Sequence, residues 1–304
     1  MPPALRGLRD RAARALAFGD KLALGQAVEA SPGEPLDSYA HAVLPRPIAA
    51  RLHRVANELI QRGWARLRIA GAIAPGTAAA ERFGSFGEGS IMGFPTAVLY
   101  GERHIHIGTG TTVNTWVTMA AGYHPDQTGL PDKVLTIGNN SVIGMRSGIV
   151  AHESITIGDD VWFGQEIYVT DANHGYSDPA TPPGKQLGDH TPVVIDDGCW
   201  IGHGSVILAG VHLGKHVVVA AGSVVRSSFP DHSVIGGVPA KLLRCYEPGV
   251  GWVRPDGTGD VVPETETVDP EQLARDLALL EAMERDGVPL DQPDDDVAPP
   301  PVRR

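Results

Sequence analysis

Aliphatic residues recur every six positions through residues 195–225, and this period dominates the hydrophobic pattern of the chain. Two inward positions separated by one outward residue define a short strand, because side chains alternate between the two faces of a strand. A fixed period of six fits neither a helix nor a hairpin, so the pattern predicts a parallel β-solenoid. The repeating aliphatic residues are Ile195, Ile201, Ile207, Leu213, Val219 and Val225. The small or β-branched residues two positions before them are Val193, Cys199, Ser205, Val211, Val217 and Ser223.

The same phase extends backwards through the middle of the chain and predicts fifteen strands in total. Glycine often follows the aliphatic residue, where a chain that turns a corner every six residues benefits from a residue without Cβ. Separate strands of an ordinary sheet would explain neither the shared phase nor these glycines. The earlier inward positions are Ile107, Val113, Met119, Ile137, Ile143, Ile149, Ile157, Phe163 and Val169.

The repeat divides the chain into three predicted parts. Residues 67–245 form the predicted solenoid domain, and residues 67–106 within it lack a clean phase, so an irregular first coil or two is expected there. Residues 1–66 are predicted to form a helical cap, because an exposed end coil leaves unpaired strand edges and apolar rungs open to water. Residues 246–304 are predicted to contain a Gly/Pro-rich loop, one helix and a disordered acidic, Pro-rich tail.

Helix signals mark both end regions. Four arginines on a Leu/Ala-rich background predict a helix within residues 1–30, before a Pro/Gly linker. Pro47 opens a second predicted helix with apolar residues at helical spacing, and Gly63 is expected to stop it. In the C-terminal extension, Asp269 is the expected N-cap of a third helix, whose leucines share one stripe.

Charge and composition restrict the classes of partner. The 304-residue chain has a formal net charge of -11, which is the wrong sign for binding nucleic acid phosphates. No apolar run approaches the roughly 18 residues that span a bilayer, and the first residues lack the pattern of a secretory signal, so a cytoplasmic protein without membrane insertion is predicted. The two cysteines cannot form a disulfide framework, and the inward position of Cys199 predicts a packed core thiol.

Several motifs carry a resemblance to a known family. Residues 234–244 read VIGGVPAKLLR, and CWIG, AAGSVV and TDANHGYSDP precede them. With these motifs, roughly residues 80–245 resemble the hexapeptide-repeat acyltransferases, which include the maltose, galactoside and virginiamycin acetyltransferases. The resemblance implies a left-handed parallel β-helix with three hexapeptides per triangular coil. It also implies a homotrimer, with acetyl-CoA as cosubstrate between neighbouring subunits.

His174 is the candidate catalytic base. Acyl transfer from a thioester to a hydroxyl releases the acceptor proton, and histidine, with a reference pKa of about 6.5, is suited to accept it. His174 lies in a long interruption of the repeat between Val169 and Ile195, and long loops in compact repeat domains are usually functional. In the resembling family, a histidine in the matching loop is the general base for direct transfer. Asp171 is expected either to orient this ring or to form an Asx turn.

The resemblance also nominates residues for acetyl-CoA. Cationic side chains suit the phosphates of coenzyme A, which makes Lys241 and Arg244 the expected phosphate contacts; ordinary solvated charges are the alternative. The positions that match the family are Asn114, His203, Ala221, Arg226, Lys241 and Arg244.

The phase predicts where the acceptor binds. Counted as three strands per coil, the interruptions after Met119, Ile149 and Val169 all leave the same corner of the prism. They would bring one set of side chains to one edge, which we expect to be the acceptor pocket. A corner that merely tolerates insertions because it faces solvent is the alternative. The residues expected along this edge are His124, His152, Glu153 and His174.

The leading functional hypothesis is an acetyl-CoA-dependent O-acetyltransferase acting on a saccharide hydroxyl. The run HGYSDP followed by PPGKQ resembles the branch that modifies capsule, exopolysaccharide and lipopolysaccharide. The same chemistry on an antibiotic or nucleotide-sugar amine is one alternative, and a silent trimeric scaffold is another, disfavoured by the intact His174. Hexapeptide carbonic anhydrases hold zinc with three histidines, but their pair of histidines five residues apart is missing here, so no metal is expected.

Overall fold

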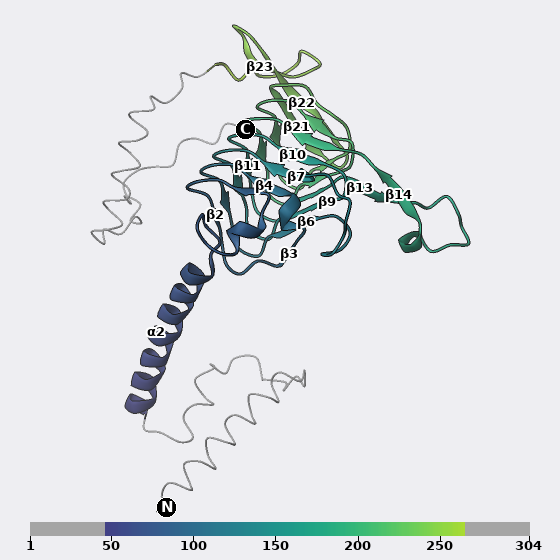
Figure 1. Cartoon of the computed structure of the whole chain (residues 1–304). Helices are drawn as coiled ribbons and strands as arrows, with labels where there is room; N and C mark the ends of the chain where they lie inside the picture. Colours follow the sequence, from purple (N-terminus) through teal and green to yellow (C-terminus); the bar gives the residue numbers. More distant parts are fainter. Residues whose placement is uncertain (1–45, 265–304) are drawn as a thin grey trace, which may run out of the picture. The chain divides into compact units, whose positions relative to one another are not determined.

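A computed structural model describes residues 46–264 of the chain (Figure 1). The chain divides into two compact units, Met1–Leu67 and Arg68–Arg304. The helix predicted near the start, its linker, the helix capped by Asp269 and the acidic tail lie outside the described residues. Within residues 46–264, no helix combines the length and apolar character needed to cross a bilayer.

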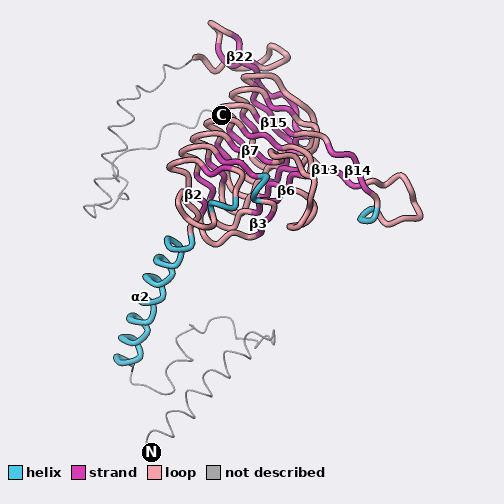
Figure 2. The backbone as a smooth tube through the Cα atoms, in the orientation of Figure 1, coloured by secondary structure: helices cyan, strands magenta, loops and turns pink. Residues whose placement is uncertain are grey.

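Three parallel sheets form the second unit, and successive strands of the chain pass from one sheet to the next (Figure 2). Sheet 1 contains β1 (Ser85–Phe86), β4 (Ile105–Ile107), β7 (Leu135–Ile137), β10 (Ile155–Ile157), β15 (Val193–Ile195) and β18 (His212–Leu213). Sheet 2 begins with β2 (Ile91–Met92), β5 (Thr112–Val113), β8 (Val142–Ile143), β11 (Trp162–Phe163), β16 (Trp200–Ile201) and β19 (Val218–Val219). Sheet 3 contains β3 (Val98–Tyr100), β6 (Thr118–Ala121), β9 (Gly148–Ala151), β12 (Tyr168–Thr170), β17 (Val206–Ile207) and β20 (Val224–Val225).

The fold is the parallel β-helix expected from the repeat, with the left hand that the family resemblance implied, and all fifteen predicted strands are present. The pairing keeps the predicted phase from coil to coil, as in Ile149 opposite Val169 and Val169 opposite Ile207. Every predicted inward aliphatic residue is at most 4% exposed. Burial of each such side chain stabilises the fold by roughly 1.5–3 kcal/mol.

The small inward positions are buried as well. Cys199 is 1% exposed, and its Sγ donates a hydrogen bond to the carbonyl of Gly214 at 3.1 Å. Burial raises the pKa of this thiol to about 12, so Cys199 is a core residue and not a nucleophile. At the corners, coils approach too closely for a side chain: a Cβ on Gly144 would lie 1.7 Å from the carbonyl oxygen of Gly164.

The first coil is irregular in spacing, as expected, but it is complete. Strands β1, β2 and β3 form a complete first coil that pairs in register with the next one, for example Met92 opposite Val113 and Leu99 opposite Met119. The six-residue step holds from Phe86 to Met92, but the next inward residue, Leu99, follows after seven positions. This extra residue conceals the phase in the sequence.

The helix α2 (Arg46–Gly71) continues through Gly63, where the sequence analysis ended it. A glycine inside a helix costs only about 1 kcal/mol relative to alanine, and the residues after Gly63 include no proline and favour a helix. The apolar residues Leu52, Val55 and Leu59 are 55–66% exposed. The capping role of this helix stays a prediction.

The prediction of a loop after Cys245 was also wrong. Sheet 2 continues through β21 (Ser233–Gly237), β22 (Ala240–Glu247) and β23 (Gly251–Val253), and the last two pair antiparallel, with Cys245 opposite Val253. Gly249, at a φ of 77°, supplies the turn between them. A composition rich in glycine therefore indicated the turn but concealed the strands around it.

Candidate active site

All three interruptions of the repeat leave one edge of the β-helix, as predicted. Strands β6, β9 and β12 are direct neighbours in sheet 3, so the segments that follow them emerge one above another. Neighbouring strands of a sheet lie about 4.8 Å apart. We call this border between sheets 3 and 1 the insertion edge.

The longest interruption is a two-stranded ribbon that projects from the β-helix (Figure 1). Its strands are β13 (Ala172–His174) and β14 (Leu187–His190), with Ala172 opposite His190 and His174 opposite Leu187. The side chain of Gln186 fastens the tip, because its Nε2 donates to the carbonyls of Asp178 at 2.9 Å and Thr181 at 2.6 Å. The ribbon thus holds His174 and His190 on adjacent strands.

Asp171, at the root of the ribbon, is fully buried and organises the coil below. Its carboxylate accepts hydrogen bonds from the backbone N–H groups of His152, Glu153 and Ser154, each at 2.8 Å. One oxygen also lies 3.7 Å from His152 Nδ1. The described contacts of this carboxylate are with the short segment after β9, so Asp171 positions His152 and not the ring of His174.

Three imidazoles and a phenol line one cavity of about 210 Å³ on the insertion edge. The rings of His152 and His190 stack, with centroids 5.3 Å apart and planes inclined by 11°. Tyr123 packs on His152 with its centroid at 4.4 Å, and its hydroxyl hydrogen-bonds to His190 Nε2. We call this cavity, lined by Tyr123, His152, His174 and His190, the histidine pocket.

The sequence analysis missed Tyr123 and His190. Both lie at the ends of interruptions, Tyr123 just after β6 and His190 just before β15. Tyr123 lies at the opening end of its interruption, directly before the predicted His124. Because an insertion that leaves an edge must return to it, the closing end of the longest interruption carried an equal signal for His190. Nothing in the sequence indicated, however, that the ring of His190 would stack on His152.

The pocket favours the neutral form of His152. Burial lowers the pKa of His152, and the neighbouring rings of His190 and His174 lower it further, while the carboxylate of Asp171 opposes the shift. The Nδ1 atoms of His152 and His190 are buried and have no hydrogen-bond partner among the described residues. A neutral imidazole with a free nitrogen can accept a proton, which a reaction of a hydroxyl group requires.

The lowered pKa of His152 predicts an acid-sensitive fold. In the unfolded chain, His152 is protonated below its ordinary pKa of 6.5, whereas in the folded chain it stays neutral to a lower pH. The free energy of unfolding therefore falls as the pH drops from 6.5 towards the lowered pKa of the folded state. The free energy of unfolding in urea should therefore decrease more between about pH 7.5 and about pH 5.5 for the wild type than for His152→Gln. An equal decrease in both proteins would contradict this assignment.

Two predicted residues of the edge lie outside the histidine pocket. His124 lines a separate cavity with Arg103 and Gln127. The side chain of Glu153 is exposed, and its backbone N–H, not its carboxylate, contributes to the site through Asp171. The predicted edge is confirmed, but its residues are divided between two cavities.

Three of the six residues nominated for acetyl-CoA gather on a different edge, whereas Arg226, which follows β20 of sheet 3, lies on the insertion edge. Asn114, His203 and Ala221 each follow a strand of sheet 2, are exposed, and lie between sheets 2 and 3. His203 Nε2 is 3.9 Å from a carboxylate oxygen of Glu166 on the same edge. Sheet 3 separates this border from the insertion edge, so these three residues do not converge with the histidine pocket within one chain.

The three cationic residues nominated for acetyl-CoA differ in whether their side chains are free to bind a phosphate. Arg226, after β20, and Lys241, in β22, are exposed. Arg244 Nη1 donates to the carbonyls of Trp252 at 3.2 Å and Asp260 at 2.8 Å, so its guanidinium already has partners in the C-terminal hairpin. Exposed backbone and two available cations fit a phosphorylated, extended ligand such as coenzyme A.

The histidines on the outer faces have partners of their own. His212 Nε2 lies 2.8 Å from a carboxylate oxygen of Asp196, and His216 stacks on His232 with centroids 5.2 Å apart. In the part of the chain that the structure describes, no three His, Cys, Asp or Glu side chains are arranged to hold a metal ion.

Comparison with known proteins agrees with this fold. Residues 192–227 match the model of the bacterial transferase hexapeptide, and residues 134–170 match the hexapeptide repeat of succinyl-transferase. The chain is 38% identical over 120 residues to the putative lipopolysaccharide biosynthesis O-acetyl transferase WbbJ of Escherichia coli K12, covering 37% of this chain and 61% of that protein. It is 27% identical over 164 residues to a galactoside O-acetyltransferase of Lactococcus lactis, covering 54% and 64%.

The chain thus spans somewhat less than two thirds of the length of these relatives. Among solved structures, a hexapeptide-repeat-containing acetyltransferase from Vibrio cholerae, complexed with acetyl coenzyme A, is 27% identical with a TM-score of 0.35, covering 55% of this chain and 73% of that one. The repeat, the two family models and the acetyltransferase relatives together show that this β-helix is built from hexapeptide repeats similar to those of the hexapeptide-repeat acyltransferases.

Proposed function

We propose that this protein is an acetyl-CoA-dependent O-acetyltransferase that acetylates a saccharide hydroxyl. The histidine pocket carries this proposal, because it gathers imidazoles, at least one of them kept neutral by burial, in a cavity open to an acceptor. The two relatives reported above are named as O-acetyl transferases, which supports the same chemistry.

In the proposed mechanism, His174 is the general base. The acceptor oxygen attacks the thioester carbonyl carbon as its proton passes to the imidazole, and the tetrahedral intermediate then expels the thiolate of coenzyme A. The imidazolium returns the proton to the sulfur, so the base is regenerated without an acyl-enzyme. Tyr123, His152 and His190 bind and orient the acceptor, while Asp171 holds His152 in place.

The active form is proposed to be a homotrimer, because Asn114, His203 and Ala221, three of the residues nominated for acetyl-CoA, lie on a different edge of one chain from the histidine pocket. A neighbouring subunit can bring the two edges together. A cyclic trimer requires two different contact surfaces on each subunit. The outward residues of sheets 2 and 3 are largely apolar, including Trp162, Trp200, Val98 and Tyr168 at 42–61% exposure, whereas those of sheet 1 are mostly polar.

Light scattering at micromolar concentration should give a mass of about three times 32.1 kDa. Trp200→Glu should shift the protein towards the monomer, because it places a charge on an apolar face. The matched control is Thr156→Glu, an exposed outward position on sheet 1 of the preceding coil, which should leave the mass unchanged. A monomeric wild type, or equal effects of both variants, would contradict the proposed interface.

Thiol release from acetyl-CoA tests the reaction itself. The purified protein should release coenzyme A in the presence of neutral and acidic saccharides, and product analysis should show an acetyl ester. Acetylation of a nucleotide-sugar or antibiotic amine in place of a hydroxyl would instead indicate an N-acetyltransferase. Absence of thiol release with every acceptor would indicate a scaffold and would overturn the proposed function.

A further inference from the structure

A second cavity, of about 190 Å³, lies on the insertion edge beside the histidine pocket. It is formed by the segment after β3, which contains the short helix η3 (Glu102–His104), and by the interruption after β6. The two cavities share the latter segment as a wall, because Tyr123 lines the histidine pocket and the next residue, His124, lines the second cavity. The two cavities are therefore neighbours along the insertion edge.

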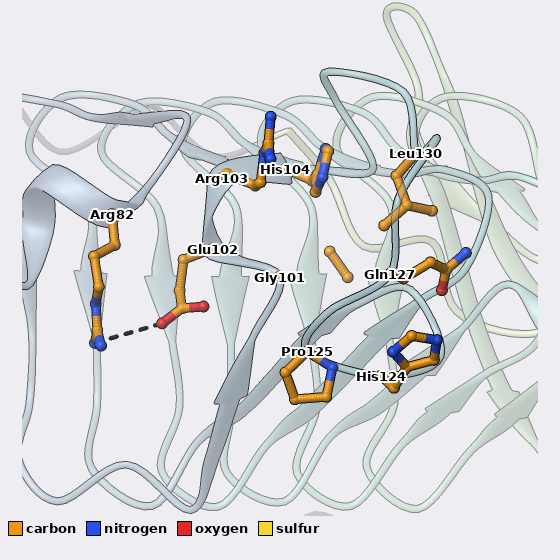
Figure 3. A pocket seen from close by; sticks show the side chains of 10 residues that line it. Arg82, Gly101, Glu102, Arg103, His104, His124, Pro125, Gln127 and Leu130 are labelled. Atoms are coloured by element: carbon orange, nitrogen blue, oxygen red, sulfur yellow. Dashed lines mark ion pairs between the residues drawn. The ribbon is translucent and has the colours of Figure 1, made fainter.

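The charge around the second cavity is opposite in sign to that of the chain. The chain carries a net charge of -11, yet the cavity is lined by two arginines and two histidines against one carboxylate. That carboxylate, on Glu102, is only 17% exposed and pairs with Arg82 at 3.4 Å (Figure 3). Arg103 has no carboxylate within 4.0 Å among the described residues, so its positive charge is available to a ligand.

Hydrogen-bond donors are available beside this charge. Gln127 Oε1 accepts the backbone N–H of Tyr123 at 2.6 Å, which turns its amide nitrogen into the free end of the side chain. His104 donates from Nδ1 to the carbonyl of Pro131 at 2.6 Å, which holds the ring against the wall of the cavity. Figure 3 shows His124, Gln127 and Leu130 on the opposite side from the Arg82–Glu102 pair. The cavity thus combines donors with an apolar wall, as a site for a charged sugar requires.

We propose that the second cavity is a subsite for an anionic group, a carboxylate or a phosphate, carried by the acceptor next to the unit that is acetylated. Arg103 is the principal contact, because a guanidinium binds either group through paired hydrogen bonds. His124 and Gln127 complete the site. This inference rests on the proposed function for the identity of the ligand as an acceptor, and it names an acidic or phosphorylated saccharide as the acceptor class.

Binding without catalysis tests the subsite directly. Glucuronic acid, glucose 1-phosphate and glucose are titrated into the full-length protein without acetyl-CoA, while the ring signals of His124 and His104 are followed by NMR. At least one of the two anions should bind saturably, and glucose should not. Arg103→Ala should weaken that binding by about 10-fold or more. Lys133→Ala, which removes the same charge from an exposed position in the same interruption, should leave it unchanged.

The comparison of the two anions decides whether the group is a carboxylate or a phosphate. Failure of both to bind, or binding that Arg103→Ala does not weaken, would overturn the subsite even if the protein is an active acetyltransferase. Binding that depends on Arg103, without thiol release from any acceptor, would instead overturn the proposed function and keep the anion site. In an active enzyme, Arg103→Ala should raise KM for the acidic acceptor about 10-fold and leave KM for acetyl-CoA unchanged.

Discussion

Replacing His174 by alanine is expected to lower the rate of acyl transfer by about 10²–10⁴-fold, the usual contribution of a general base. The side chain is exposed on the ribbon, so its loss should change neither the thermal midpoint nor the KM for acetyl-CoA. Steady-state thiol release measures the effect. His212→Ala is the control, because that histidine is exposed on sheet 1 and pairs with Asp196, away from the pocket.

The same assay distinguishes His174 from the other imidazoles of the pocket. His152→Ala and His190→Ala should chiefly raise KM for the acceptor, because these rings stack on each other and on Tyr123 and shape the cavity. Full activity in His174→Ala, together with a collapse of turnover in His152→Ala, would transfer the role of base to His152. The pH profile of turnover would then follow the lowered pKa of His152.

Removal of the Asp171 carboxylate is expected to cause the largest loss of stability. Asp171→Ala leaves the N–H groups of His152, Glu153 and Ser154 without their acceptor at a fully buried position. Each buried group left unsatisfied costs about 1–3 kcal/mol, so a loss of about 3 kcal/mol or more is expected. Urea unfolding at neutral pH measures it.

Two variants show whether the hydrogen bonds are responsible. Asp171→Asn should lose less than Asp171→Ala, because its amide oxygen can take the place of Oδ2, which accepts from both Glu153 and Ser154. Glu153→Ala, an exposed neighbour, should change stability by no more than about 0.5 kcal/mol. If Asp171→Ala were as stable as Glu153→Ala, the carboxylate would not be the anchor of this segment.

The sequence by itself determined the β-helix, because its core is built from local repetition. Each inward residue is set by its position in a six-residue step, so Ile201 or Val225 could be assigned to the interior without knowledge of distant contacts. The same counting assigned the interruptions to one edge, since strands three steps apart must be neighbours. The first coil was missed because the six-residue step lengthens to seven between Met92 and Leu99 and to eight between Leu99 and Ile107.

Only the tertiary structure decided how the edge is used. Contacts between side chains on separate interruptions follow no period, so neither the stacking of His190 on His152 nor the hydrogen bonds of Asp171 to the coil below could be counted from the sequence. The partners of Arg244 likewise come from a hairpin that composition had suggested was a loop. Repetition specifies the scaffold through steps of six residues, whereas the pocket depends on distances between residues tens of positions apart, which the folded backbone alone sets.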